Sequence, residues 1–321
     1  YIGSHTVRQL IKTGADVTVL DSMVYGHPAA IVDKEVKLVK GDLGDPAVVY
    51  PLLINGNFDA VIHFAAFIQV GESVTDPIKY YENNIAKPLV LLKAMMLGGC
   101  KRFVFSSTCA TYGVPTQVPI PETEKQDPIN PYGGSKFMLE KVCKDCDRAY
   151  GLKSVFLRYF NASGSSVDGV IGEDHEPESH IIPVILQAIK GERPGITVFG
   201  TDYDTPDGTC IRDYIHVDDL ALAMLDAICK PASFRQIFCI GGPDVVTNAD
   251  YFRLLGKVSG VDVTIETIPL EGYLEAHPQY SGHLCHRCYD MTKLREAGIR
   301  VPCTSLEEGL RQQIAWLENQ T

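Results

Sequence analysis

The fold is decided at the start of the chain by the stretch YIGSHTVRQLIKTGADVTVLD, residues 1–21. Within it, Ser4–Lys12 has the pattern of a helix closed by Gly14, and Val17–Leu20 is a β-branched run typical of a strand. Asp21 ends that strand. A helix that starts near a glycine and leads into a strand ending in an acid is part of a βαβ unit. We expect the strand that precedes this helix in such units to be absent from the printed chain.

The same alternation continues through the first half of the sequence. The other predicted strands are Lys37–Val39, Ala60–His63, Arg102–Ser106 and Ser154–Phe160, and the other predicted helices are Pro46–Leu53, Asp76–Leu97 and Tyr132–Tyr150, the last closed by Gly151. Strands alternating with helices predict a parallel sheet that binds ligands at the carboxyl ends of its strands. The fold class is therefore α/β, with a Rossmann-type doubly wound parallel sheet.

After Asn161 the alternation gives way to loops rich in Gly, Asp and Pro, at Gly164–Asp174 and Gly200–Gly208. Such segments form poor sheets and good binding loops. A helix is predicted at Ile215–Lys230 and one more strand at Gln236–Ile240. We therefore expect a smaller α/β domain made of two pieces of the chain. The predicted division is 1–161 plus about 211–241 for the first domain, and 162–210 plus 242–321 for the second.

Composition narrows the class of protein. The chain has 321 residues, 45% of them hydrophobic, with a formal net charge of -11. Nucleic acids and anionic membranes require a basic surface, so neither is an expected partner, and an anionic substrate would need local cations. No run of about 18 apolar residues and no signal peptide is visible, so we expect a cytoplasmic protein whose ten cysteines are reduced.

Several segments predict a site for a dinucleotide. The glycine of Tyr1-Ile2-Gly3-Ser4-His5 lets a pyrophosphate approach the start of a helix, and Asp21 follows it by 18 residues, where an acid accepts hydrogen bonds from the adenosine ribose. An acid at that position favours NAD over NADP. Gly41-Asp42-Leu43 is expected near the adenine, Phe64-Ala65-Ala66 near the pyrophosphate, and Asn84 on the long helix facing it.

A tyrosine and a lysine predict the catalytic chemistry. Tyr132 and Lys136 are four residues apart, which places them on the same face of one helix. A phenol with a pKa of about 10 is a poor base at neutral pH, but a neighbouring ammonium and a cationic nicotinamide favour the phenolate. Tyr132 can then remove a proton from a sugar hydroxyl. Ser106-Ser107-Thr108 ends a strand, and the Thr108 hydroxyl can bridge Tyr132 and the reacting oxygen.

Taken together, these motifs resemble the UDP-glucose/UDP-galactose 4-epimerases of the extended short-chain dehydrogenase/reductase superfamily. The resemblance spans nearly the whole chain. It rests on Tyr1–His5, Val61–Ala66, Val70–Ser73, Tyr80–Asn84, Phe105–Thr108, the Tyr132 and Lys136 pair, Arg158–Asn161 and Asp207–Val217.

The resemblance implies a tightly held NAD and two half-reactions on a UDP-hexose. Tyr132 takes the proton of the 4-hydroxyl as hydride leaves C4, a 4-keto sugar rotates, and hydride returns to its opposite face. The implied cofactor contacts also include Ser106, Lys136 and Tyr159. The implied substrate contacts are Thr108, Asn161, His180, Ile181, Val198, Phe199 and Arg212, with the Arg212 guanidinium on the phosphates.

The sequence departs from the family at one place. Most relatives carry a phosphate-binding Arg after the Pro of a Pro-Arg-x-Gly-Asp segment, whereas this chain has Pro269-Leu270-Glu271-Gly272-Tyr273. Two phosphates beside Arg212 alone would be under-neutralised. We therefore expect Arg287, in the longer segment that follows, to replace the missing cation.

The paired cysteines have a plainer interpretation than a zinc site. Zinc sites have spacings like that of Cys143 and Cys146, and like that of Cys285 and Cys288, which lie beside His283 and His286. We expect no metal, because the two pairs are far apart in sequence.

The apolar stretch Ile85–Leu97 has more apolar side chains than one buried helix face needs. In relatives the helices corresponding to 76–97 and 132–150 pair in a dimer, so a homodimer is expected.

Other functions use the same residues. Sugar-nucleotide dehydratases and decarboxylases share the Tyr, Lys and NAD, but Thr108-Cys109 lacks the Asp-Glu pair typical of such dehydratases. Another alternative is a catalytically silent NAD(H)-binding regulator, a role taken by relatives that have lost the tyrosine or lysine. Both residues are present here, so an epimerase is the favoured interpretation.

Overall fold

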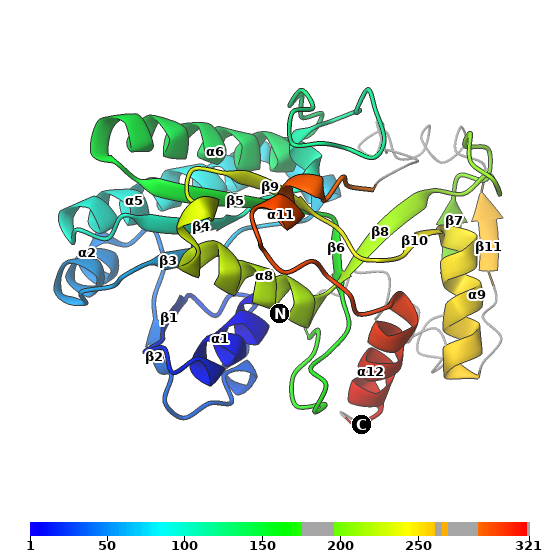
Figure 1. Cartoon of the computed structure of the whole chain (residues 1–321), viewed down its shortest axis with the longest axis horizontal. Coiled ribbons are helices and arrows are strands. Elements are labelled where there is room, and N and C mark those ends of the chain that lie inside the picture. The colour runs from blue at the N-terminus through cyan, green and yellow to red at the C-terminus, as the bar shows by residue number, and fades with distance from the viewer. Residues whose placement is uncertain (175–195, 261–264, 269–287, 320–321) are drawn as a thin grey trace.

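The computed structural model describes residues 1–174, 196–260, 265–268 and 288–319. None of the helices within these ranges is long and apolar enough to cross a bilayer. Figure 1 shows a sheet with helices on both faces at one end, and a second group of strands and helices at the other. The division into two domains at the residues given above stays a prediction.

The principal sheet has four parallel strands in the order β3-β4-β5-β9. The strands are β3 (Val61–His63), β4 (Arg102–Ser106), β5 (Lys153–Tyr159) and β9 (Ile237–Ile240). Four of the five β4 residues and six of the seven β5 residues are buried. A strand buried on both faces is typical of a parallel sheet covered by two helical layers.

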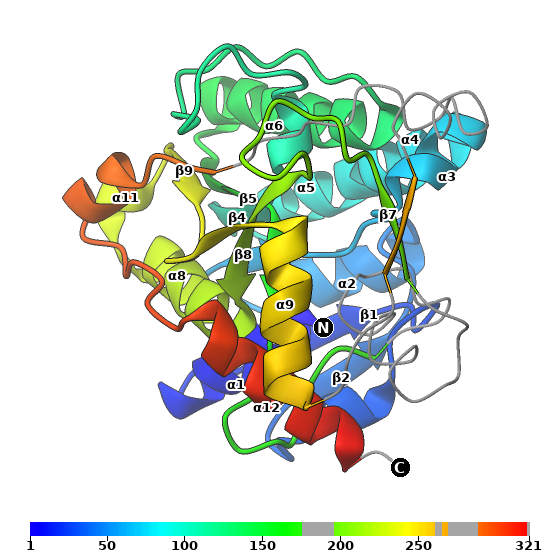
Figure 2. The ribbon, with the colours of Figure 1, turned by 90° about the vertical axis from the view of Figure 1, so that its right-hand side faces the viewer.

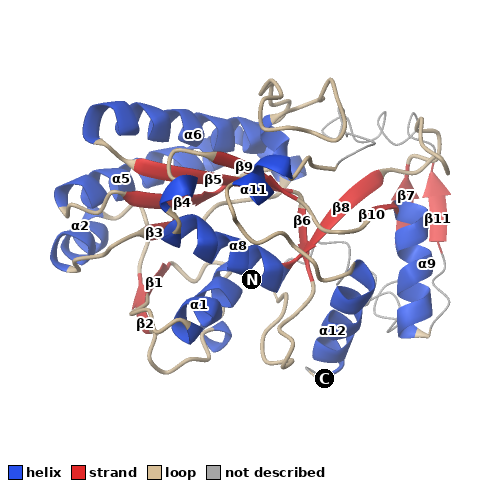
Figure 3. Ribbon diagram, in the orientation of Figure 1, coloured by secondary structure: helices blue, strands red, loops and turns tan. Residues whose placement is uncertain are grey.

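Successive residues of β4 point into different apolar clusters. Phe103 and Phe105 pack with α2 (Pro46–Asn55), α5 (Lys87–Leu97) and α6 (Pro131–Tyr150). On the other face, Val104 packs with α8 (Val217–Cys229), and α11 (Thr292–Glu296) adds Leu294 to the same cluster. This two-sided burial confirms the doubly wound α/β fold (Figure 3).

Three smaller sheets complete the described strands. β1 (Thr18–Asp21) pairs in parallel with β2 (Lys37–Lys40). β8 (Ile211–His216) lies between β6 (Asn161–Ser163), parallel to it, and β10 (Val245–Thr247), antiparallel to it. β7 (Ile196–Phe199) pairs in parallel with β11 (Ile265–Ile268). Figure 1 shows this last pair near α9 (Asn248–Ser259), at the opposite end of the molecule from β1, and in Figure 2 α9 faces the viewer.

The remaining helices and helical turns are mostly short. In sequence order, they are α1 (Ile2–Lys12), the 3-10 turn Pro28–Ala30, α3 (Val70–Thr75), α4 (Pro77–Tyr81), the π-helical turn Glu82–Ala86, the 3-10 turns Cys109–Thr111 and Pro231–Ser233, and α12 (Leu306–Glu318).

The helix that carries the proposed catalytic pair begins and ends as its sequence dictates. Asn130 caps α6 by accepting a hydrogen bond from the Gly133 amide at 2.8 Å, and Pro131 occupies the first turn. Gly151 ends the helix in the left-handed conformation, with φ of 73°. The predicted span Tyr132–Tyr150 is therefore confirmed to within one residue.

Two predicted elements differ from the structure. Asp76–Leu97 is not one α-helix but α4, a π-helical turn and α5, with Asp76 as the N-cap of α4. Pro88 in the first turn of α5 cannot donate a main-chain hydrogen bond, which accounts for the irregular turn before it. Ile215–Lys230 is not all helix, since Ile215 belongs to β8 and the helix starts at Val217.

Candidate active site

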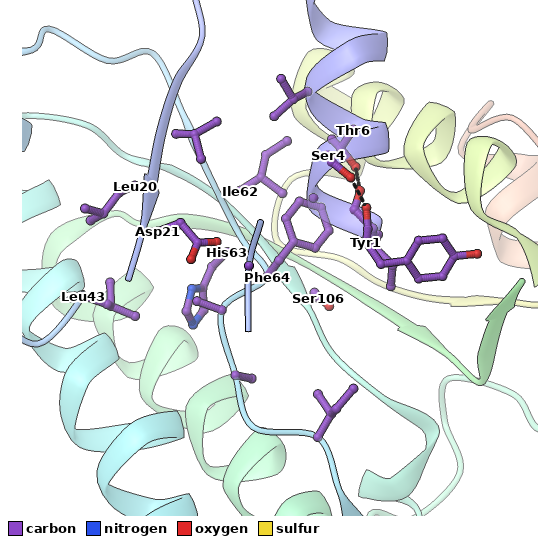
Figure 4. Close-up of a pocket in the computed structure, with 18 of the residues that line it drawn as sticks. Tyr1, Ser4, Thr6, Leu20, Asp21, Leu43, Ile62, His63, Phe64 and Ser106 are labelled. Atoms are coloured by element: carbon purple, nitrogen blue, oxygen red, sulfur yellow. Dashed lines mark hydrogen bonds between the residues drawn. The ribbon is translucent and has the colours of Figure 1, made fainter. Parts of the chain in front are cut away.

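One large cavity, of about 1550 Å³, lies between the β1–β2 sheet and the four-stranded sheet. Figure 4 shows Asp21, Leu43, His63 and Phe64 around the same space, with Ser106 deeper in the view. Among the predicted site residues, those that line the cavity are Gly3, Asp21, Asp42, Leu43, Phe64, Ala65, Ala66, Ser106, Thr108, Tyr132, Lys136, Tyr159 and Asn161. Pockets that bind one small molecule usually have a volume of about 300–1,000 Å³, so this cavity has room for more than one ligand group.

At one end of the cavity two acids end successive strands of the β1–β2 sheet. Asp21 is the last residue of β1 and accepts a hydrogen bond from the Met23 amide at 2.7 Å. Asp42 follows β2 and accepts hydrogen bonds from Lys87 Nζ at 2.6 Å and the Gly44 amide at 2.7 Å. Burial opposes ionisation, yet these two donors hold the pKa of Asp42 below its ordinary value.

A glycine between these acids is required by close packing. A Cβ at Gly41 would lie 2.7 Å from Val48 Cγ1, closer than real Cβ contacts allow. The Gly41 amide donates to the Asp21 carbonyl oxygen at 3.0 Å, so the chain leaves β2 close to the end of β1. This hydrogen bond keeps Asp21 and Asp42 at one edge of the sheet, and the absence of a side chain at Gly41 leaves room for Val48.

The phenol and the ammonium lie at the other end of the cavity. Lys136 is buried, donates from Nζ to the Ser106 carbonyl oxygen at 2.9 Å, and lies 4.9 Å above the Phe105 ring centroid. Burial lowers the pKa of Lys136 to about 7. Burial also raises the pKa of Tyr132, while a hydrogen bond with Thr108 acts in the opposite direction. The structure thus brings together Tyr132, Lys136 and Thr108.

Ser106 and Tyr159 form a second pair of hydroxyls on the cavity wall. Their oxygen atoms share a short hydrogen bond, and burial raises the pKa of Tyr159 to about 12. Both are thus neutral hydroxyls at physiological pH. They come from the adjacent strands β4 and β5, as expected for residues at one end of a parallel sheet.

Two predicted site residues lie outside the cavity wall. Asn84 is buried, and its side-chain amide makes three hydrogen bonds. Oδ1 accepts from the Phe67 main-chain N–H at 2.9 Å, and Nδ2 donates to the Phe67 carbonyl oxygen at 3.0 Å and to Ser135 Oγ at 3.1 Å. Asn84 therefore links Phe67 to α6 without lining the cavity, whereas its neighbour Asn83 does line it. Arg212 is half-buried in β8 and donates to its neighbour's carbonyl oxygen, that of Ile211, at 3.0 Å.

Other predicted substrate residues fall on segments that the structure describes in part or not at all. Val198 and Phe199 belong to β7, where only the main chain is described. His180, Ile181, Leu270, Cys285 and Arg287 lie outside the described residues. Cys143 is buried on α6, where burial raises the pKa of its thiol, and no group of metal-ligating side chains occurs in the described part of the chain.

Sequence reasoning missed His63 and the buried pair Glu140 and Arg158. His63 lines the cavity and stacks on the rings of Phe103 and Phe105 in β4. Burial and then the Lys136 charge lower its pKa to about 3, so it is neutral. Glu140 and Arg158 are both fully buried and joined by two hydrogen bonds. The four-residue spacing from Lys136 places Glu140 on the same helix face, but no local signal identifies its partner Arg158 on β5.

Comparisons with known proteins agree with this geometry. The profile of the NAD dependent epimerase/dehydratase family matches residues 1–241. The UDP-glucose 4-epimerase of Lacticaseibacillus casei is 48% identical over 269 residues, which cover 82% of this chain and 80% of that protein.

Solved structures give the same result over nearly the whole chain. UDP-glucose 4-epimerase from Brucella ovis in complex with NAD has a TM-score of 0.90 and 39% identity, covering 98% of this chain and 94% of that one. The Bifidobacterium longum enzyme in complex with NAD⁺ and UDP has a TM-score of 0.91 and 31% identity, covering 99% and 96%. This chain belongs to the NAD dependent epimerase/dehydratase family.

Proposed function

We propose that this protein is an NAD-dependent epimerase that inverts C4 of a UDP-hexose and so interconverts UDP-galactose and UDP-glucose. The observation that carries the proposal is the cluster of Tyr132, Lys136 and Thr108 in the same cavity as Asp21. Relatives at 46–48% identity over more than four fifths of this chain are UDP-glucose 4-epimerases.

The residues present fit NAD. The carboxylate of Asp21 faces the cavity, where it can accept hydrogen bonds from ribose hydroxyls and would repel the extra phosphate of NADP. Leu43, Phe64, Ala65 and Ala66 supply an apolar wall, in which the two alanines add little bulk and Phe64 lies beside Gly3. The chemistry that NAD supplies when bound is removal of hydride from sugar C4 and its return to the opposite face.

Tyr132 is the proposed proton acceptor for the sugar 4-hydroxyl. In the protein alone burial keeps its phenol protonated, so ionisation at neutral pH needs nearby positive charge and the Thr108 hydroxyl. Lys136 is placed to supply part of this charge, since it lies one helical turn away. Thr108 holds the phenol oxygen and the sugar oxygen near each other. The same three groups return the proton when hydride comes back.

The nucleotide part of the substrate is proposed to bind around Asn161, which lines the cavity and donates from Nδ2 to the Asp213 carbonyl oxygen at 3.1 Å. The neighbouring strand β8 carries Arg212, our proposed phosphate contact. His180, Ile181, Val198, Phe199 and Arg287 remain proposed substrate contacts on the sequence argument. Anchoring through the nucleotide leaves the hexose free to rotate between the two half-reactions.

We also propose a cytoplasmic homodimer that pairs residues 76–97 and 132–150 with their counterparts. Large apolar side chains are exposed along these helices, with Ile78 64%, Leu89 45% and Met138 46% exposed. These three come from α4, α5 and α6; α5 and α6 cover the same face of the sheet (Figure 1), and α4 packs against α6. Sedimentation equilibrium of the parent and of Ile78→Glu tests this, since the charge should shift the protein towards monomer.

The test of the function is direct. The purified protein is incubated with UDP-galactose and NAD, and the products are separated by chromatography. UDP-glucose should accumulate to equilibrium without net formation of NADH. A 4-keto-6-deoxy product would indicate a dehydratase, and tight NAD binding without turnover of any nucleotide sugar would indicate a regulator.

A further inference from the structure

A buried ion pair joins the catalytic helix to the sheet. Glu140 on α6 and Arg158 on β5 are both 0% exposed. Arg158 Nε donates to Glu140 Oε1 at 2.9 Å, and Arg158 Nη2 donates to Oε2 at 2.5 Å. Two planar groups held by parallel hydrogen bonds fix both distance and orientation.

The same carboxylate also binds a residue next to Thr108. Ser107 Oγ donates to Glu140 Oε1 at 2.6 Å, and Gln126 Nε2 donates to Oε2 at 3.1 Å. Each carboxylate oxygen therefore accepts two hydrogen bonds, which fills its usual acceptor capacity. Ser107 does not line the cavity, unlike Ser106 and Thr108 on either side of it.

The pair reaches Thr108 from its other side through Tyr112. Arg158 Nη1 donates to the Tyr112 hydroxyl at 2.6 Å, and the guanidinium lies 4.7 Å from the centre of that ring. Tyr112 directly follows the 3-10 turn Cys109–Thr111, which Thr108 caps. Ser107 and Tyr112, which flank this turn, are thus both bound to one buried ion pair.

Helix α6 approaches the same turn at contact distance. A Cβ at Gly133 would lie 2.4 Å from the Ala110 carbonyl oxygen, so only glycine permits this approach. Along the helix, Lys136 binds the main chain at Ser106 and Glu140 binds the side chain of Ser107. Successive helical turns therefore bind successive residues at the end of β4.

We propose that Ser107, Glu140 and Arg158 are positioning residues that set the separation between the Thr108 hydroxyl and the Tyr132 phenol. They act through Thr108 and the helix rather than by touching substrate. The proposal rests on the proposed function, because Thr108 and Tyr132 are the groups it places. A displacement of about 1 Å at reacting groups can lower a rate by about 100-fold, so such a device has a measurable effect.

The discriminating variant is Ser107→Ala, which removes one hydrogen bond and leaves the ion pair intact. We expect kcat to fall by about 10- to 100-fold, with KM for UDP-galactose and bound NAD within about twofold of the parent. In a plot of kcat against pH, the acidic limb should move to higher pH. A weaker hydrogen bond from Thr108 leaves the Tyr132 phenol harder to ionise. Tyr112→Phe, on the other side of Thr108, should give the same pattern.

The matched control is Ser233→Ala. Ser233 is also fully buried, and its hydroxyl donates to the Ala227 and Lys230 carbonyl oxygens at 2.6 Å, on the 3-10 turn after α8. The Ser233→Ala variant should lose about as much thermal stability as Ser107→Ala, and it should keep the kcat and the pH profile of the parent. If Ser107→Ala and Ser233→Ala have the same kcat and the same acidic limb, the positioning role is wrong.

A crystal structure of Ser107→Ala keeps this test separate from the proposed function. The separation between Thr108 Oγ1 and Tyr132 Oη should increase relative to the parent, whatever the activity. An unchanged separation overturns the positioning role. By contrast, a parent protein that does not convert UDP-galactose overturns the proposed function, and the crystal structure still decides whether the ion pair places these two groups.

Discussion

Lys136 donates a hydrogen bond from its buried ammonium to the main-chain carbonyl oxygen of Ser106 at 2.9 Å. The contact links the second turn of α6 to the last residue of β4. A main-chain acceptor cannot change rotamer, so the ammonium is fixed relative to the sheet. Because Tyr132 lies one turn earlier on the same helix, the contact also fixes the base relative to the cavity.

Tyr132→Phe should abolish turnover and leave NAD binding within about threefold of the parent. The change removes only the phenol oxygen, and general-base catalysis contributes about 10²- to 10⁴-fold. Steady-state kinetics with UDP-galactose and calorimetric titration of NAD measure the two effects. Tyr150→Phe, on the exposed last residue of the same helix, is the control and should be fully active. Parent-like turnover by Tyr132→Phe would exclude this residue as the base.

Lys136→Met should lower kcat by about 100-fold or more, since the phenol loses its neighbouring cation. It should also change how stability depends on pH in the cofactor-free protein. The folded-state pKa of Lys136 is about 7 against 10.5 for the free side chain. Between these values the unfolded chain binds a proton that the folded chain has released, so the parent becomes more stable as pH rises.

Methionine has no such titration, so its stability relative to the parent should be greatest below pH 7 and should decline towards pH 10. Thermal unfolding at three pH values measures this, with Lys141→Met on the exposed side of α6 as the control. A Lys136→Met curve that runs parallel to the parent across this range would contradict the depressed pKa.

Asp21→Ser should weaken NAD binding by about tenfold or more and narrow the preference for NAD over NADP. The carboxylate is lost as an acceptor for ribose hydroxyls and as a repulsive charge towards a ribose phosphate. Titration with both dinucleotides measures the ratio. Asp16→Ser, an exposed acid on the same cavity wall, makes the same change in net charge and should leave the ratio unaltered. An equal response of the two variants would refute the ribose assignment.

Asp213→Asn should flatten the stability profile between about pH 4 and 7. Asp213 is 2% exposed, accepts from the Gly242 amide at 2.7 Å, and has a pKa raised by burial from 3.8 to about 7. Between these values the folded protein keeps a proton that the unfolded chain has lost, so the parent loses stability as pH rises. Below pH 4 both states hold the proton, and the full penalty is present only above pH 7.

The three pH units between these pKa values correspond to about 4 kcal/mol for the parent. Urea unfolding at pH 4.5 and 7.5 measures the loss in the parent and in Asp213→Asn. Asp244→Asn is a suitable control, because Asp244 likewise accepts a main-chain hydrogen bond, from Leu306 at 2.7 Å. A parent whose stability rises over this interval relative to Asp213→Asn would contradict the assignment.

Elements with local signals could be predicted from the sequence. β4 matches its predicted bounds, Arg102–Ser106, and α6 follows from Asn130, Pro131 and Gly151. β8 was missed because its residues, IRDYIH, mix charged and apolar side chains and lead directly into a helix. The run Asp76–Leu97 has helical character throughout, so only Pro88 signalled the irregular turn.

In the candidate site, too, contacts within one helix could be predicted from the sequence and contacts between elements could not. Tyr132 and Lys136 could be predicted because four-residue spacing brings them together within one helix. The Glu140 and Arg158 pair could not, because it joins a helix to a strand and only the sheet brings the two side chains within hydrogen-bonding distance. Asn84 is a different case, since it lies in the π-helical turn and not in one continuous helix as predicted, and its amide is hydrogen-bonded to Phe67 and Ser135.

The most direct test of the account uses UDP-galactose carrying deuterium at C4, incubated with the protein and NAD in ordinary water. The account requires hydride to leave C4 and return to the same carbon without passing through solvent, while Tyr132 exchanges only the hydroxyl proton. NMR of the isolated UDP-glucose should therefore show deuterium retained at C4 in nearly every molecule. Replacement of that deuterium by solvent hydrogen would mean that C4 is inverted by proton abstraction, and the proposed mechanism would be wrong.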